Sequence, residues 1–231
     1  MLLARARTMA IQTHPSAESH TLLEYQCNEP RVFGIELRPA GPSDLKGVLS
    51  SLLWLGRSKA FSNELTFVVM SLPNRTDLAE LRQIAQCASE QGLADKLCLV
   101  ASSDDRCLPA TIMNVQRCGL RVLLGGVGAT SRFCDVTDHP IDGIVVEPQL
   151  IMNATGDPRA ASILDAVVAL AANLGVKSFA NECSSQSEFD LATSTGISYV
   201  TYAHPYVGDR GNADSATVRV SGMSKQSITR R

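Results

Sequence analysis

The stretch Arg121-Val122-Leu123-Leu124-Gly125-Gly126-Val127-Gly128-Ala129-Thr130 joins a short apolar run to three closely spaced glycines. Such a run is typical of a buried parallel strand, and the glycines predict a loop after it. In an α/β enzyme, a loop in this place often carries the chemical groups. Here it offers backbone N–H groups, which can hold a phosphate, and no carboxylate. Gly125, Gly126 and Gly128 are therefore candidate ligand-binding residues, although a tight strand-to-helix turn would use the same glycines.

Short apolar runs recur on both sides of this stretch and alternate with amphipathic segments, which predicts an α/β fold with a parallel sheet. The predicted strands span residues 65–70, 97–100, 121–124, 143–146, 176–180 and 197–201. Two earlier runs, 22–26 and 32–37, are separated by Asn28-Glu29-Pro30 and predict a hairpin. Eight strands with interleaved helices in about 200 residues favour a compact TIM-like barrel. An open doubly wound sheet is the alternative.

Four predicted helices begin after a residue that can cap the first turn. These residues are Ser43, Asn74 or Thr76, Asp157 and Ser185. Pro158 suits the first turn after Asp157, and Ser185-x-x-Glu188 has the pattern of a capping box. Glycines predict where three of the helices end: Gly92, Gly175 and Gly196.

Composition narrows the classes of function. The chain has 231 residues, of which 45% are hydrophobic, so one globular domain is expected. A formal net charge of −2 and scattered Lys and Arg provide no positive field for nucleic acid, so we expect no nucleic-acid partner. The sequence contains no run of 18 apolar residues, which argues against a membrane span. The basic start lacks a continuous apolar segment behind it, so we expect no secretory signal and a cytoplasmic location.

The cysteines do not form a recognisable framework. The seven of them, at positions 27, 87, 98, 107, 118, 134 and 183, are odd in number and include no C-x-x-C pair. We expect reduced, mostly buried thiols and no zinc site. The predicted organisation is an N-terminal extension over residues 1–20, the barrel over 21–207, and a flexible tail over 208–231, where no apolar period is present.

Several segments occur in a recognisable order, and a family resemblance rests on them. They are Tyr25-Gln26, Gly34-Ile35-Glu36-Leu37, Gly119-Leu120-Arg121-Val122 with the glycines, Pro140-Ile141-Asp142-Gly143-Ile144, and Leu174-Gly175-Val176 followed by Ala180. In this order and spacing the chain resembles the EAL family over residues 22–205, and active members of that family are cyclic di-GMP phosphodiesterases. The resemblance implies a barrel whose first strand is antiparallel to the rest.

The resemblance also implies site residues. Glu36 matches the first glutamate of the family signature, although Leu37 and Arg38 replace its Ala and Leu. Gln26 matches a position that faces the nucleotide in the family. Both are candidate ligand-binding residues. The alternatives are a solvated acid at a strand end for Glu36 and an ordinary strand end for Gln26.

Family chemistry depends on two divalent metals, held by carboxylates and an Asn, that activate water for attack on the phosphodiester. The other positions of this set match residues that are not the family's ligands. They are Val69 or Met70, Val100, Gly125, Gly126, Val145, Glu147, Asn181 with Glu182 beside it, Ser184 and Thr201. Mg²⁺ and Mn²⁺ need several hard oxygen ligands, so we expect no metal site, no cofactor and no catalytic residue.

The preferred reading is a catalytically inactive, degenerate EAL-like regulatory protein of bacterial cyclic di-GMP signalling that acts by protein–protein interaction. Its protein partner is unidentified. A non-hydrolysing cyclic di-GMP receptor is one alternative, and an active phosphodiesterase with unusual metal ligands is another. A homodimer through the segment 130–140 is the first candidate for self-association.

Overall fold

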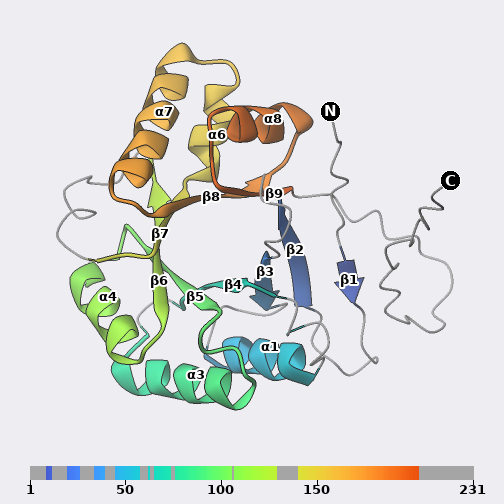
Figure 1. Ribbon diagram of the computed structural model, residues 1–231, viewed down its shortest axis with the longest axis vertical. Helices are drawn as coiled ribbons and strands as arrows, with labels where there is room; N and C mark the ends of the chain where they lie inside the picture. The colour runs from blue at the N-terminus through green and yellow to red at the C-terminus, as the bar shows by residue number, and fades with distance from the viewer. Residues whose placement is uncertain are drawn as a thin grey trace, which may run out of the picture.

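Figure 1 shows the computed structural model, which describes residues 9–11, 20–26, 34–39, 45–57, 62, 65–73, 76–105, 107–128 and 140–202. The strands are β1 (Met9–Ile11), β2 (His20–Gln26), β3 (Gly34–Pro39), β4 (Phe67–Ser71), β5 (Leu97–Ser102), β6 (Arg121–Val127), β7 (Gly143–Val146), β8 (Lys177–Cys183) and β9 (Tyr199–Tyr202). The helices are α1 (Leu45–Arg57), α3 (Leu78–Glu90), α4 (Leu108–Arg117), α6 (Pro148–Ala154), α7 (Pro158–Asn173) and α8 (Gln186–Ser194).

The strands follow one another around the sheet in chain order, from β1 to β9. The seven strands β3 to β9 pair in parallel, each with the next, and form a nearly closed barrel. Strand β2 pairs with both β3 and β9. The predicted α/β barrel is therefore confirmed, and the open doubly wound sheet is excluded.

The seven strands β3 to β9 all run parallel, so none of them is an antiparallel first strand. The strand predicted first, 22–26, is β2, and it pairs antiparallel with β3 and with β9. Antiparallel pairing is confined to β1 and β2. The hairpin predicted near the start is present, since β2 pairs with β3 from His20↔Pro39 to Tyr25↔Gly34.

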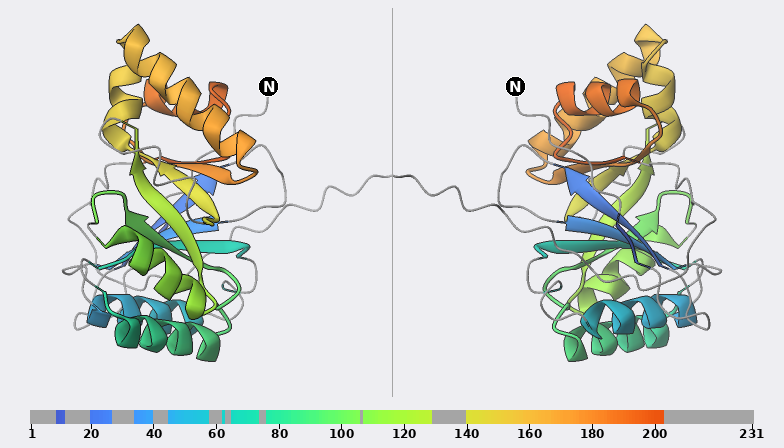
Figure 2. Two further views of the ribbon diagram at one scale, coloured as in Figure 1. Left: turned by 90° about the vertical axis from the view of Figure 1, so that its left-hand side faces the viewer. Right: turned by 90° about the vertical axis from the view of Figure 1, so that its right-hand side faces the viewer.

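Two separate hydrophobic clusters follow from the alternation of side chains along the strands. Residues that point outward from β3 to β9 pack against the helices, which lie on both sides of the barrel in Figure 2. Residues that point inward fill the barrel and are here called the inner cluster: Phe67, Val69, Cys98, Leu123, Val145, Phe179 and Tyr199, with Val100 packed against them. The rings of Phe67, Phe179 and Tyr199 pack against one another in this cluster, with their centroids 4.8 to 5.6 Å apart.

The helices bury one apolar stripe each against the outer face of the sheet. Leu52 and Leu55 of α1 and Leu164 and Val167 of α7 are at most 1% exposed. This matches the 3.6-residue period of an amphipathic helix.

Most of the predicted helix boundaries hold. Asp157 caps α7 by accepting from the Arg159 N–H at 2.8 Å, and Pro158 occupies the first turn. One cap is wrong: α3 is capped by Asp77 rather than by Asn74 or Thr76. Asp77 and Glu80 form a reciprocal capping box, with hydrogen bonds of 2.8 and 2.9 Å.

The capping box predicted at α8 is only half formed. The Ser185 hydroxyl accepts from the Glu188 N–H, but the Glu188 carboxylate accepts from the backbone N–H and the hydroxyl of Ser184 instead. Burial raises the pKa of Glu188, and the hydrogen bonds from Ser184 and Ser185 outweigh that effect and lower it overall. The predicted glycine stops are confirmed, because Gly92, Gly175 and Gly196 all have positive φ.

Some elements were not predicted or have different limits. Strand 143–146 is confirmed as β7, whereas β5 and β6 extend beyond the predicted ends at 100 and 124. Helices α4 and α6 have no side-chain cap, and so lack the usual start signal. Strand β1 lies inside the predicted N-terminal extension and pairs with β2. The tail 208–231 and the dimer segment 130–139 lie outside the described residues.

In the described part of the chain, no helix is long and apolar enough to cross a membrane. The five cysteines in that part are free thiols, and three of them are buried. Burial raises the pKa of Cys98 to about 11 and that of Cys183 to about 12. These two thiols are therefore protonated at neutral pH and inert, as expected for structural cysteines.

The rate of alkylation should differ between the exposed and the buried thiols. With iodoacetamide at pH 7.5 and peptide mass spectrometry, we expect the exposed Cys107 to react at least about tenfold faster than Cys98 and Cys183, because the thiolate is the reactive form and both buried sulfurs are shielded. Unfolding in guanidinium should remove the difference. Equal rates in the folded protein would contradict the burial of Cys98 and Cys183.

Candidate functional site

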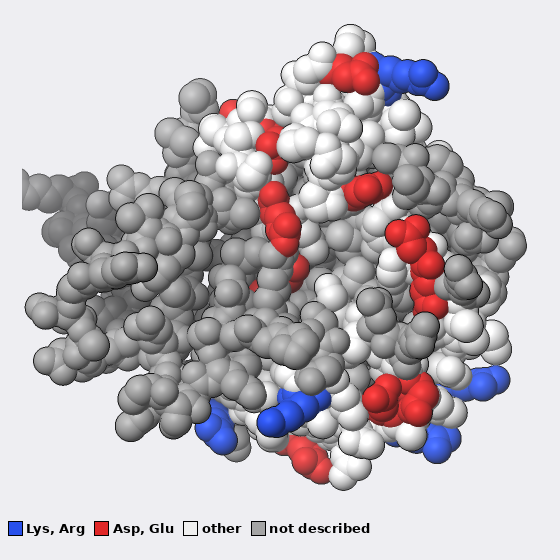
Figure 3. Space-filling model, turned by 180° about the vertical axis from the view of Figure 1, so that it is seen from behind, with Lys and Arg blue, Asp and Glu red and all other residues white. Residues whose placement is uncertain are grey.

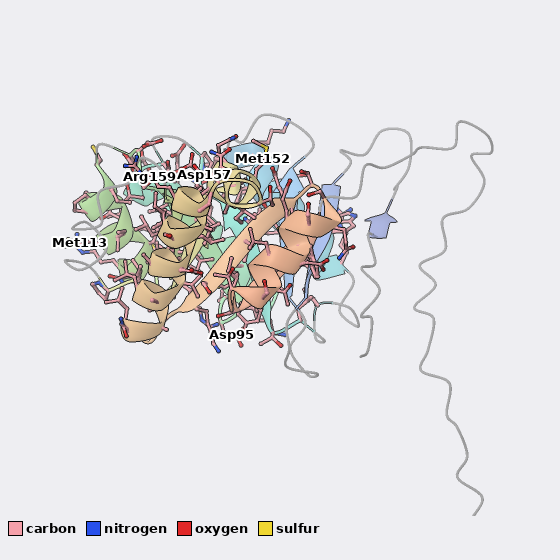
Figure 4. The ribbon with its side chains drawn as sticks, turned by 90° about the horizontal axis from the view of Figure 1, so that it is seen from above. Asp95, Met113, Met152, Asp157 and Arg159 are labelled. Atoms are coloured by element: carbon pink, nitrogen blue, oxygen red, sulfur yellow. The ribbon has the colours of Figure 1, made fainter. Side chains whose placement is uncertain are left out.

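The candidate site lies where the parallel strands end, because side chains at the carboxyl ends of a barrel share one open face. Figure 4 shows the two ends of the barrel: Met152, Asp157 and Arg159 lie on the carboxyl-end side, and Asp95, which precedes β5, lies on the opposite side. Figure 3 views the carboxyl-end face directly. This face is here called the mouth.

Glu36 points into the barrel just below the mouth. Two residues earlier, a Cβ on Gly34 would meet the ring of Phe67 in the inner cluster, so alternation along β3 turns Glu36 inward as well. Glu36 is 4% exposed. Its carboxylate is engaged within the protein, although its Oε2 atom accepts no hydrogen bond from the described residues.

Gln26 does not lie opposite Glu36. The β2–β3 register pairs Glu36 with Leu23, and Gln26 lies three residues further toward the amino end of β3. The backbone of Gln26 pairs with Val200 in β9. The side chain of Gln26 is outside the described part of the structure, so its proposed contact with a ligand stays a prediction.

The glycine stretch is not the loop that the sequence predicts. Gly125 and Gly126 belong to β6, which continues to Val127 with a register shift after Leu124. Gly126 has a φ of 74°, which permits the irregularity. The carbonyl of Gly125 accepts from the Ser103 N–H at 2.9 Å. The carbonyl of Gly126 accepts from the Ser103 hydroxyl at 3.2 Å.

A side chain is disfavoured at both glycines of this pair, by a close contact at Gly125 and by the backbone conformation at Gly126. A Cβ on Gly125 would lie 2.6 Å from Cγ1 of Val100. A Cβ on Gly126 would lie 3.0 Å from the Ser103 hydroxyl oxygen, on a backbone with positive φ. Gly128 serves packing in the same way, because its Cβ would lie 2.6 Å from a methyl group of Leu150 in α6. The three glycines therefore have structural reasons independent of a ligand.

The floor of the mouth is aliphatic. Val69 is 0% exposed and Val145 is 5% exposed, and both belong to the inner cluster with Leu123. Val100 packs against the same cluster. Val69, Val100 and Val145 occupy the positions where the family resemblance calls for a metal-binding Asn, a metal-binding Glu and a Lys, in that order. They offer no oxygen or nitrogen to a ligand.

Polar groups at the mouth come from the ends of β7, β8 and β9. Glu147 directly follows β7 and is partly exposed. Asn181 and Glu182 in β8 are also partly exposed. Glu182 is the one non-glycine residue with positive φ in the described chain, at 64°, and its N–H donates to the Thr201 hydroxyl at 2.9 Å. Glu147 stands at a position that the resemblance assigns to a different family residue, and Glu182 lies beside Asn181, which is another such position.

The described loops of the mouth carry acidic residues. Acidic residues lie at or after the carboxyl ends of several strands: Asp104, Asp105, Glu147 and Glu182. Among the described residues between those strand ends and the helices that follow, there is no Lys or Arg. In Figure 3, the coloured acidic side chains lie around a hollow in this face, and the coloured basic ones lie near its edge.

The donor set does not fit a pair of divalent metals. Within the described ranges, no group of three or more His, Cys, Asp and Glu side chains could hold a metal ion. Glu36 lies over an aliphatic floor, and Gly125 and Gly126 supply no carboxylate. Mg²⁺ and Mn²⁺ need near-octahedral oxygen ligands. The described residues therefore do not supply the ligands of a two-metal site.

Solved structures share this fold. The EAL domain of Mycobacterium smegmatis DcpA superposes with a TM-score of 0.67 at 15% identity, over 79% of this chain and 88% of that chain. A standalone EAL protein from Vibrio cholerae O395, in its c-di-GMP-bound form, gives 0.65 at 13% identity, over 82% and 91%. The Xanthomonas citri FimX EAL domain in complex with c-di-GMP gives 0.61 at 14% identity, over 78% and 85%.

Sequence comparison is more specific than these superpositions. No curated protein matches the chain. The family model of the EAL domain matches residues 64–201, which is more than half of the chain and spans β4 to β9. The chain therefore belongs to the EAL domain family.

Proposed function

We propose that this chain is a catalytically inactive EAL domain protein that acts in the cytoplasm, within bacterial cyclic di-GMP signalling, by contact with another protein. One observation carries the proposal: the β6 positions that match the family's paired aspartates are glycines, Gly125 with no space for a Cβ beside Val100 and Gly126 with a positive φ. The aliphatic floor beneath them supports the same conclusion.

The chemistry of the reaction explains the weight of this observation. A phosphodiester is very inert, and metal-bound water supplies much of the barrier lowering in this class of enzyme. Glu36 is one retained carboxylate, and it stands beside Val69 in the β3–β4 register. One carboxylate above apolar side chains does not provide the ligand number that two dications require.

A non-hydrolysing cyclic di-GMP receptor is the second candidate. Two structurally similar EAL domains carry cyclic di-GMP in their crystals, which favours this candidate. Cyclic di-GMP has two phosphodiester groups, each with one negative charge. The described loop residues at the mouth include acids and no Lys or Arg, and Arg38, at the carboxyl end of β3, is one base against two phosphodiester groups. Binding through protein contacts therefore ranks above binding of the dinucleotide.

An active enzyme with unusual ligands is the third candidate. Glu147 and Glu182 are the observation in its favour, because they bring two further carboxylates to the ends of β7 and β8. The backbone of Glu182 departs from regular strand geometry, because its φ is positive and its N–H donates to the Thr201 hydroxyl. The aliphatic positions Val69, Val100 and Val145 remain without oxygen ligands, which places this candidate last.

The exposed apolar side chains do not identify the partner face. Leu53, Met113, Met152 and Leu174 are each more than a third exposed, but they lie on different elements or at their ends. Single exposed apolar residues are ordinary on a protein surface. The proposed homodimer segment lies largely outside the described residues, so that contact stays a prediction.

A calorimetric titration with cyclic di-GMP tests the proposal against the receptor candidate. We expect no saturable heat up to ligand concentrations of about 100 μM, with or without Mg²⁺, which corresponds to binding weaker than about −5.5 kcal/mol. An active EAL domain in the same buffer provides the positive control. Saturable binding that disappears in Glu36→Ala would favour the receptor and refute this part of the proposal.

A further inference from the structure

Val100 lies next to the glycine pair of β6. It is an inward-facing residue of β5, and it pairs in register with Leu123 in β6 and Ser71 in β4. It is partly buried and packs on the inner cluster. Its Cγ1 atom stands 2.6 Å from the place where a Cβ on Gly125 would be, and the Ala101 carbonyl oxygen stands 3.4 Å from it.

This contact leaves little freedom for adjustment. Two carbon atoms attract each other best at about 3.5 to 4.0 Å, and 2.6 Å is strongly repulsive. Valine is stiff at χ1 because it is β-branched, so its methyl group cannot rotate away cheaply. The strand itself is held on both sides, by β4 and by β6. A side chain at position 125 is therefore strained as long as position 100 is valine.

We infer that Val100 determines the glycine at position 125 and thereby keeps an acidic side chain out of the mouth. This inference rests on the proposed function, because it explains why the lost carboxylate returns by a single substitution only at a cost in stability. The γ1 methyl group at position 100 must move or be removed before position 125 can carry a side chain without strain. The two positions act as one steric pair across the β5–β6 junction.

Gly126 provides a contrast within the same strand. Its φ of 74° disfavours any L side chain, whatever the space around it. The nearest atom to its added Cβ is the Ser103 hydroxyl oxygen, and Val100 is not among its neighbours. The cost of a substitution at Gly126 is therefore independent of the residue at position 100.

A double-mutant cycle on the full chain tests the steric pair. The variants are Gly125→Ala, Val100→Ala and the two combined, and the melting temperature and urea midpoint of each are measured. We expect Gly125→Ala alone to lower the melting temperature by roughly 2–10 °C, as overpacking does. In the Val100→Ala background, the same change should lower it by less than half as much.

Matched controls separate this pair from general fragility of the barrel. Gly126→Ala and Gly128→Ala should each cost the same in both backgrounds, because an added Cβ meets the Ser103 hydroxyl at Gly126 and Leu150 of α6 at Gly128, rather than Val100. As a test with the acid itself, Gly125→Asp should fold better in the Val100→Ala background than alone.

Equal loss from Gly125→Ala in both backgrounds would overturn the inference, and so would a Gly125→Ala variant with unchanged stability. If Gly125→Ala alone does not fold, a folded double variant supports the inference, whereas an unfolded one beside a folded Val100→Ala refutes it. Hydrolysis by the wild-type chain would refute the proposed function and leave this coupling unaffected.

Discussion

Purified chain incubated with cyclic di-GMP and Mg²⁺ or Mn²⁺ should form linear dinucleotide at least about 1,000-fold more slowly than an active EAL domain assayed beside it. Each factor of ten in rate corresponds to about 1.4 kcal/mol of barrier, and loss of metal activation removes several kcal/mol of stabilisation. The mouth has Glu36 over Val69 and Val100, and Gly125 and Gly126 supply no carboxylate. Chromatography of the reaction over several hours measures the product.

Restoring the aspartates should not restore activity. The variant Gly125→Asp with Gly126→Asp rebuilds one part of the metal shell and leaves Val69, Val100 and Val145 unchanged. It should also lower the melting temperature, because position 125 has no space and position 126 has positive φ. The informative control is Glu36→Ala. Turnover in the wild-type chain that vanishes in Glu36→Ala would show an active site and refute the inactive reading.

The sequence predicts the barrel because its strands are buried on both faces. Continuous apolar runs such as 143–146 mark such strands, and the order of the runs matches the order of strands around the barrel. The signals for helices were caps and glycines, and they failed where caps were absent. Helices α4 and α6 begin with proline in the first turn but have no side-chain cap. Strand β1 is three residues long, too short for a pattern.

The sequence predicts the site only in part, because the contacts that shape it join residues that are distant in the sequence. The presence of Glu36 and the absence of aspartates at 125 and 126 are visible in the residues themselves. The steric contact between Val100 and Gly125 depends on the β5–β6 register, which the sequence does not specify. The sequence predicts a loop at the glycine stretch, because a positive φ within a paired strand leaves no local signal in the residues.

The largest effect on stability is expected from Gly34→Ala, at the opposite end of β3 from the mouth. An added Cβ would lie 2.0, 2.2 and 2.5 Å from three atoms of the Phe67 ring. Phe67 cannot move aside easily, because its ring packs edge-on against Phe179 and at a tilt against Tyr199 inside the barrel. The ring centroids are 5.6 and 4.8 Å apart, respectively. Overpacking of a filled core costs about 1–3 kcal/mol and sometimes more. Thermal melting should show a decrease of roughly 5–10 °C.

Gly156→Ala is the matched control, because an added Cβ there has no atom within 4 Å. Gly156 also lies outside the glycines with positive φ, so this variant should be neutral or slightly more stable, through the lower entropy of its unfolded state. A second variant tests the cause of the loss: Gly34→Ala combined with Phe67→Leu should recover part of the stability, since leucine leaves space where the ring stood. If Gly34→Ala melts like wild type, the ring must have an alternative position, and the tight approach of β3 to the inner cluster would be refuted.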